Sequence, residues 1–328
     1  MNPKSTFLQR GLLAAAVACA AWGIAVPARA AAFSIEEAFL NSTLPPEWKL
    51  MGAAGTGTWT PHLTAGPNPG DDAEGEGWLR LTQNVDEQVG TAVYNKPFSS
   101  AQGLQITFDY AAYGGSKADG LAFYLLDGNT TNPTLGYHSA TLGYAAVPSP
   151  SVPGVTGGYV GIGLDEWGGF SNSNIGNGCT IPCMPNPQSV TVRGAGNLVS
   201  GFPLLASVPL SSFGLQVSTL DRANAQTVRI TLSAVSVAKP EPTLTVEIDP
   251  TGKGTNFVTV IPALKLPSPP ATFKLGFSAS TGGSNNVHEV RIRRTVKSIP
   301  ALGQSTLGAL AAMLALLTLP ALRRRVRN

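Results

Sequence analysis

The stretch Gly114–Leu125 has the sequence Gly-Gly-Ser-Lys-Ala-Asp-Gly-Leu-Ala-Phe-Tyr-Leu, and its two halves predict different structures. The first half places Asp119 beside Gly120 in a tight, glycine-flanked turn. The second half is an apolar run that predicts a buried strand. We therefore expect Asp119 on a rigid turn just before a buried strand, where a carboxylate accepts hydrogen bonds from neighbouring hydroxyls. The alternative is an acidic residue that only ends a hairpin.

Outward from this stretch, the chain between residues 33 and 297 repeats short apolar or alternating runs. Clusters of glycine, proline, asparagine and serine separate these runs. Many short strands between turn residues predict a β-sandwich, and the length suits one large sandwich. Val147–Gly158 is a Pro/Gly-rich loop inside it rather than a linker between domains. The sequence thus predicts a single all-β domain over 33–297.

Several motifs follow one another in order along this domain. They are Gly77–Thr82, Val89–Tyr94, Leu104–Tyr110, the Ala118-Asp119-Gly120 turn, Gly161–Phe170, Ser189–Gly194, Lys274–Gly282 and Asn286–Val290. Together they resemble the L-type (legume-like) lectins. The resemblance implies a concanavalin A-like jelly roll of two large antiparallel sheets. It also implies non-catalytic carbohydrate binding, with a polysaccharide or glycan as the partner and Asp119 as the sugar acceptor.

The resemblance implies further residues for the sugar site. Gly120 belongs to the same turn as the acceptor, and Gly169 stands where the family has an asparagine that touches both calcium and sugar. Tyr113 and Trp167 are the aromatic candidates for stacking on the apolar face of a sugar ring. Phe170 is the third aromatic residue here, and we expect it in the core instead.

The stretch Gly161–Phe170 aligns with the metal-binding strand of legume lectins, which carries Glu-x-Asp-x-aromatic-x-Asn. Here Gly163 replaces the glutamate, while Asp165 is kept. No histidine lies between Leu142 and Val287. The carboxylate and imidazole of a transition-metal site are therefore missing, and we expect no transition metal.

Calcium needs six to eight oxygen ligands, some of which are carbonyls, amides or waters. Asp165, the Trp167 carbonyl, Asn172 or Asn174 and Asp119 are candidates for a weak calcium site. The alternative interpretation is a strand end that holds no metal. Both interpretations stay open at this point.

The two ends of the chain carry targeting patterns. Residues 1–30 have basic residues, then an apolar run, and end in Ala28-Arg29-Ala30, which is typical of a secretory signal peptide. Residues 298–328 contain Ile299-Pro300-Ala301-Leu302, an apolar stretch over 305–322 and a basic tail over 323–328. This end resembles bacterial C-terminal sorting signals of the Ile-Pro-Thr-Leu type, with alanine in place of threonine.

The C-terminal pattern predicts a transmembrane helix over 305–322, with the arginines on the cytoplasmic side. A plain membrane anchor is the alternative to a sorting signal. We therefore expect an exported protein at the cell envelope, cell surface or outside the cell. Its partners would include the membrane before processing, and the export and sorting machinery.

Charge and cysteine content narrow the function further. Seven of the 22 basic residues lie in the terminal segments and all 19 acidic residues lie between them, so the middle has a net charge of −4. This argues against nucleic acid as a partner. Cys179 and Cys183 are close neighbours in an exported chain, which predicts a local disulfide.

Two other function classes compete with carbohydrate binding. β-Glucan hydrolases share the jelly roll but need two carboxylates on a Glu-x-Asp-x-x-Glu strand, and here both glutamate positions, 163 and 168, are glycine. We therefore predict no catalytic residues and no enzyme. The second alternative is a structural surface or matrix protein that keeps the sandwich and binds no sugar.

Overall fold

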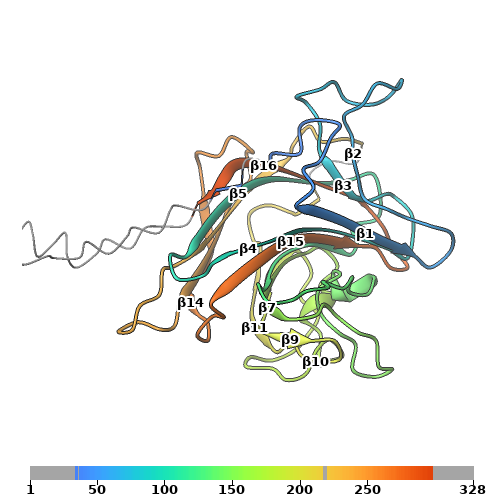
Figure 1. The fold of residues 1–328 in the computed structure, drawn as a ribbon. Helices are drawn as coiled ribbons and strands as arrows, with labels where there is room; N and C mark the ends of the chain where they lie inside the picture. The colour runs from blue at the N-terminus through green and yellow to red at the C-terminus, as the bar shows by residue number, and fades with distance from the viewer. Residues whose placement is uncertain (1–33, 36, 217–219, 298–328) are drawn as a thin grey trace, which may run out of the picture. The chain divides into compact units, whose positions relative to one another are not determined.

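The computed structural model describes residues 34–35, 37–216 and 220–297, which form two antiparallel β-sheets packed on each other (Figure 1). The front sheet has nine strands in the order β1-β4-β15-β6-β7-β8-β11, with β9 paired to β7 and β10 paired to β9. The back sheet has seven strands in the order β14-β13-β12-β5-β16-β3-β2. The predicted all-β sandwich of two antiparallel sheets is confirmed.

The strands range from 2 to 12 residues and follow the apolar runs of the sequence, and two 3₁₀-helices, η1 and η2, lie in the loops. In chain order the elements are β1 (Trp48–Ala54), β2 (His62–Leu63), β3 (Leu79–Thr82), β4 (Gln88–Ser99), β5 (Leu104–Tyr113), β6 (Gly120–Asp127), η1 (Ser139–Thr141), β7 (Gly158–Asp165), η2 (Gly169–Ser171), β8 (Ser189–Arg193), β9 (Gly196–Asn197), β10 (Ser200–Gly201), β11 (Leu204–Pro209), β12 (Gln226–Leu232), β13 (Thr243–Asp249), β14 (Val258–Lys265), β15 (Thr272–Ser280) and β16 (Val287–Lys297).

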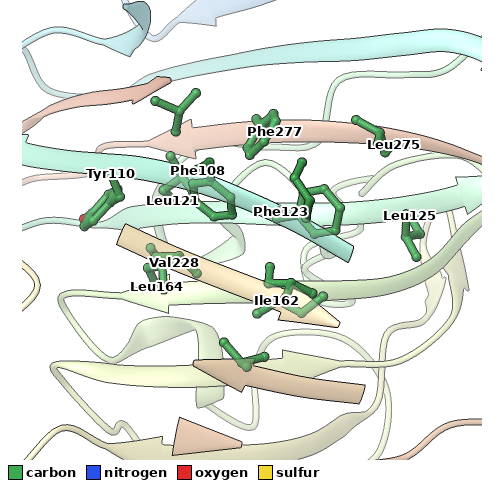
Figure 2. Packing of buried hydrophobic residues seen from close by; sticks show 14 of the residues in the cluster. Phe108, Tyr110, Leu121, Phe123, Leu125, Ile162, Leu164, Val228, Leu275 and Phe277 are labelled. Carbon is green, nitrogen blue, oxygen red and sulfur yellow. The ribbon is translucent and has the colours of Figure 1, made fainter. Parts of the chain in front are cut away.

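The apolar run of β6 is continuous because both faces of the front sheet are buried. Leu121, Phe123 and Leu125 point toward the back sheet and join the main core. There Phe277 lies 5.4 Å from Phe123 and 5.1 Å from Phe108 of β5, ring centroid to ring centroid. Figure 2 shows these side chains filling the space between strands of the two sheets. This rigid core holds the end of β6 in place.

The alternate residues of β6 belong to a second core on the other face of the front sheet. Tyr124 packs there with Tyr144, at 5.7 Å between ring centroids, and Tyr144 packs with Phe202 at 5.2 Å. Phe170 of η2 is fully buried in the same cluster, as expected from the sequence. This second core covers the front sheet with the loops that carry η1 and η2.

Strand register brings three loops to one end of the front sheet. Gly120, the first residue of β6, pairs with Asp165, the last residue of β7. On its other side Gly120 pairs with Ser280, the last residue of β15. The turn before β6, the loop after β7 and the loop after β15 therefore meet at this end.

Some sequence predictions concern other parts of the chain. The signal peptide over 1–30 and the sorting signal over 298–328 lie outside the described residues. Within the described part, no helix is long and apolar enough to cross a membrane. Cys179 and Cys183 are joined by a disulfide, as predicted.

Candidate ligand-binding site

The backbone of the Asp119 turn is held on both sides. The amide of Asp119 donates to the Ser280 carbonyl at 2.9 Å. Its own carbonyl accepts the amides of Glu166 at 3.0 Å and Trp167 at 3.3 Å. The peptide bond between Ala118 and Asp119 is cis. The turn is thus tied to β15 and to the loop after β7.

Gly120 is required by both conformation and space. Its φ is 141°, a region that residues with a Cβ rarely adopt. A Cβ at this position would lie 2.1 Å from the Leu164 carbonyl oxygen. The glycine beside the predicted sugar acceptor therefore has a structural reason within the sheet itself.

The carboxylate of Asp119 is buried and incompletely bonded. The residue is 4% exposed, and its Oδ2 has no hydrogen-bond partner among the described residues. Burial, and then the charge of Glu166, raise the pKa of Asp119 to about 7. Buried polar atoms are nearly always paired, so this oxygen marks a place where a ligand donor would be stabilised.

Ser139 and Gly282 lie beside that carboxylate oxygen. A Cβ built on Gly282 would be 2.8 Å from Ser139 Oγ and 3.0 Å from Asp119 Oδ2, so the three residues lie close together. Ser139 is fixed there by its backbone. Its amide donates to the Thr281 carbonyl at 3.0 Å, and its carbonyl accepts the Ser280 hydroxyl at 2.6 Å.

Two exposed aromatic residues lie in the loops that pack against the turn. Trp167, whose amide contacts the Asp119 carbonyl, is 55% exposed. Tyr137 is 40% exposed, and its ring lies 3.9 Å from the ring of His138. The buried Nδ1 of His138 has no partner among the described residues, and burial lowers the pKa of His138. A neutral imidazole and two aromatic surfaces thus belong to the same group of loops.

The other predicted aromatic residue, Tyr113, makes its contacts elsewhere. Its hydroxyl accepts a hydrogen bond from Arg80 at 3.2 Å, and Arg80 is paired with Glu289. Tyr113 also packs against the small cluster of Trp78 and Ala111. These contacts lie on the back sheet, and none of them is with Asp119.

Glu166 lies at the centre of a buried polar network that connects the loop after β7 to the back sheet. Its Oε1 accepts the Tyr110 hydroxyl and lies 2.9 Å from His288 Nε2. Its Oε2 accepts the Asn286 amide at 2.5 Å. Nδ1 of His288 is in turn 2.7 Å from the Thr82 hydroxyl. His288 is thus a bonded residue of the sheet, and Glu166 is a structural residue that the sequence had not indicated.

The positions at which legume lectins carry metal-binding side chains are filled differently here. A Cβ on Gly163 would lie 2.6 Å from the Phe170 ring, so this ring occupies the space of the missing glutamate. A Cβ on Gly169 would lie 2.6 Å from the Cβ of Ala140, so η1 packs directly on the glycine. Neither position has room for an oxygen-bearing side chain without displacement of its neighbour.

Of the other predicted calcium ligands, Asp165 and Asn172 already have partners and Asn174 faces solvent, whereas Asp119 keeps an unpaired oxygen. Asp165 is fully buried, and its oxygens accept the amides of Gly168 at 2.8 Å and Phe170 at 2.9 Å. Burial raises the pKa of Asp165 to about 8. Asn172 Oδ1 accepts the next amide, of Ser173, and Asn174 is exposed. The side chains of Asp165, Asn172 and Asn174 do not fit calcium as they stand, and among residues 34–35, 37–216 and 220–297 no three His, Cys, Asp or Glu side chains are grouped to hold a metal.

Gly282 and Arg193 were not predicted as residues of this site, although each lies in a recognisable sequence motif. Gly282 ends one of the motifs of the resemblance, but nothing in the sequence placed it against Asp119. Arg193 lies on the same face of β8 as Ser189 and Thr191, because alternate residues of a strand point to the same side. A charge on a strand whose every residue is buried is unusual.

Comparisons with known proteins agree with this architecture. No protein-family model matches the chain, and no curated protein matches it by sequence. The exoplasmic/lumenal domain of VIP36, in its Ca²⁺/Man3GlcNAc-bound form, superposes with a TM-score of 0.50 at 14% identity, over 80% of this chain and 91% of that one. Peanut lectin gives 0.47 at 20% identity (81% and 96%), and the lectin of Bauhinia forficata gives 0.47 at 15% (82% and 98%). At these identities the likeness shows a lectin-like sandwich fold.

Proposed function

We propose that this protein is a non-catalytic, lectin-like carbohydrate-binding protein that is exported and sorted to the cell envelope. The observation that carries the proposal is the unpaired Oδ2 of Asp119, enclosed with Ser139 Oγ above Gly282. A sugar hydroxyl is a donor that satisfies this oxygen, and a charged acceptor makes that bond strong. The exposed Trp167 lies beside the same turn and supplies an apolar surface for a sugar ring.

The proposed site differs in part from the residues predicted by sequence. Asp119 accepts the sugar hydroxyl, Gly120 holds the turn, Trp167 stacks, and Gly169 allows η1 to bring Ser139 close. Tyr137 is a second aromatic candidate on the same loops. Tyr113 is left out because its hydroxyl is bonded to Arg80 of the back sheet.

A hydrolase of the same fold is the less favoured alternative. Glycoside hydrolysis needs two carboxyl groups that flank the scissile bond. Asp165 and Glu166 are buried, and their oxygens are bonded to amides and side chains of the protein. Release of reducing ends from a β-glucan by the purified protein would overturn the non-catalytic assignment.

A glycan array tests the proposal against a purely structural role. The full-length protein is applied to glycans that end in mannose, galactose or N-acetylgalactosamine and to immobilised β-glucans, with chelator and with calcium. We expect at least one of these to retain the parent, and Asp119→Asn to reduce the affinity at least about tenfold. Absence of binding to every glycan in both conditions would favour the structural surface protein.

Asp127→Asn is the matched control for this substitution. Asp127 is the last residue of β6, so it is an aspartate at the opposite end of the strand that begins beside Asp119. Retention unchanged in Asp127→Asn and lost in Asp119→Asn would assign the effect to the proposed site. Equal loss in both variants would contradict that assignment.

A further inference from the structure

Arg193, the last residue of β8, is the largest fully buried side chain among the described residues. All three of its guanidinium nitrogens donate to backbone carbonyls. Nε donates to Phe170 at 2.6 Å, and the two terminal nitrogens donate to Phe202 and Asn172 at 2.8 Å each. A buried arginine whose donors all bind carbonyl oxygens holds the chain segments that supply those oxygens.

Two of those carbonyls belong to the loop after β7, which carries the predicted sugar and metal residues. The guanidinium also lies over the Phe170 ring, 5.5 Å from its centroid. The amide of Phe170 donates to Asp165, so this residue is held by the carboxylate on one side and by the arginine on the other. η2 is therefore fixed by side chains of β7 and β8.

The third carbonyl belongs to the segment before β11. Gly176, farther along the loop after β7, approaches that segment closely: a Cβ there would lie 2.2 Å from the Phe202 carbonyl oxygen. The same Cβ would lie 3.0 Å from an Arg193 terminal nitrogen. The arginine thus joins Phe170 and Asn172 of the loop to the segment before β11, whose Phe202 belongs to the second core.

This arrangement supplies what a metal ion supplies in a calcium-dependent loop. A bound cation gathers carbonyl oxygens and orders the chain around itself. Here a fixed cation gathers them, because burial lowers the pKa of Arg193 only to about 10 and the group stays protonated at neutral pH. Asp165 is the acidic group that acts on this charge. A guanidinium in this place also opposes binding of a second cation.

We propose that Arg193 is the positioning residue of the ligand-binding loop and replaces a calcium ion there, so that the loop is ordered and binds its ligand without divalent metal. The proposal rests on the proposed carbohydrate function for its binding part. Its structural part, the order of the loop, stands independently and is tested independently.

Hydrogen exchange of the full-length protein tests the structural part without any glycan. In chelator, the amides of Gly168, Phe170 and Asn172 should be protected in the parent, and calcium should change their rates less than about twofold. In Arg193→Lys the charge is kept but the fork of donors is lost, and these amides should exchange at least about tenfold faster. Phe123, in the centre of the front sheet, should be unaffected, which separates a local effect from general destabilisation.

Arg229→Lys is the matched control. Arg229 also uses a fork of donors, to Glu247 of β13, but it lies on the back sheet. It should leave exchange of the loop amides unchanged. The proposal is overturned if Arg193→Lys leaves the loop amides protected, or if the parent loop is protected only when calcium is added. The second outcome decides the question even if Arg193→Lys fails to fold.

Retention on the glycan found by the array tests the binding part. Parent retention should be the same in chelator and in calcium, and Arg193→Lys should lose at least about tenfold in affinity. Calcium-dependent retention would overturn the proposal. If the parent binds no glycan, the proposed function fails, while the exchange experiment still decides the role of Arg193.

Discussion

Asp119 and Glu166 are neighbouring buried acids at the same end of the front sheet, yet their surroundings differ. Glu166 has partners on both carboxylate oxygens, drawn from the back sheet and from the loop after β15. Asp119 has an oxygen with no partner among the described residues. A buried acid that is fully bonded stabilises one arrangement of the chain, whereas one left unpaired weakens the fold and serves another purpose. The difference distinguishes Glu166, which holds the loops in place, from Asp119, the proposed ligand acceptor.

We expect the largest loss of stability from Glu166→Ala, which removes the fully bonded acid. The substitution leaves Tyr110, Asn286 and His288 without their acceptor in a buried site. We expect a loss of about 3–5 kcal/mol in the free energy of unfolding, measured by urea denaturation.

Glu241→Ala is the control for this measurement. Glu241 is exposed, and its substitution should change stability by no more than about 0.5 kcal/mol. A loss below about 1 kcal/mol in Glu166→Ala would mean that the network does not stabilise the loops, and the contrast with Asp119 would disappear.

The unpaired acid, Asp119, should make the stability of the protein depend on pH. The pKa of Asp119 is about 7 in the folded protein against an ordinary 3.8, so the folded state keeps a proton that the unfolded state releases. Stability should therefore fall as pH rises from about 4 to about 7, by up to about 4 kcal/mol from this residue. Asp119→Asn should lack this part of the loss and should melt higher than the parent at about pH 8, where the parent carries the buried charge.

Ligand binding should follow the opposite trend with pH. The ionised acceptor is about tenfold more abundant at pH 8 than at pH 6, so retention should rise by about that factor. Burial raises the pKa of Asp165 to about 8 and lowers that of His138, so both groups titrate near this range or below it. The difference between the parent and Asp119→Asn reports Asp119 together with its effect on Asp165, because the charge of Asp119 contributes to the raised pKa of Asp165. Identical pH profiles for the two proteins would show that Asp119 does not titrate in this range.

Gly282 and Gly283 are adjacent, but only Gly282 lies against Asp119 and Ser139. Gly282→Ala would place a methyl group between Ser139 Oγ and Asp119 Oδ2, and neither its backbone conformation nor a rigid backbone neighbour opposes the change. We expect a loss of affinity of about tenfold with stability within about 1 kcal/mol of the parent. A Cβ on Gly283 has no atom within 4 Å, so Gly283→Ala should bind as the parent does. Equal retention by the two variants would show that the space above Gly282 is not the binding site.

The sequence predicted the sandwich because its signals are local. Apolar runs and turn residues lie within a few positions of one another, and the Asp119 turn combines both. The site depends instead on register between distant strands. Nothing near Gly120 in sequence indicates that it pairs with both Asp165 and Ser280, which places Gly282 beside the acceptor.

The predicted metal ligands illustrate a second limit of the sequence. A motif shows which residue types are present, but not which donors their oxygens already face. Asp165 matches the family position, yet its oxygens accept two amides of its own loop. The cation of that loop comes from Arg193, a residue on another strand that no local pattern connects to the motif. The weak calcium site remains a prediction, and the exchange experiment with and without calcium tests it.

The smallest expected effect concerns the exposed surface beside the unpaired acid. Trp167 is 55% exposed, so Trp167→Ala removes little buried area and should leave the melting temperature close to that of the parent. If the indole stacks on a sugar ring, its loss should cost about 0.5–1.5 kcal/mol of binding, a severalfold fall in retention. Trp167→Phe keeps an aromatic face and should recover most of that loss, whereas a hydrogen bond from the indole nitrogen would not be recovered by phenylalanine. Retention that is unchanged in Trp167→Ala would restrict the ligand to the polar groups around Asp119 and would leave Tyr137 as the aromatic surface to test next.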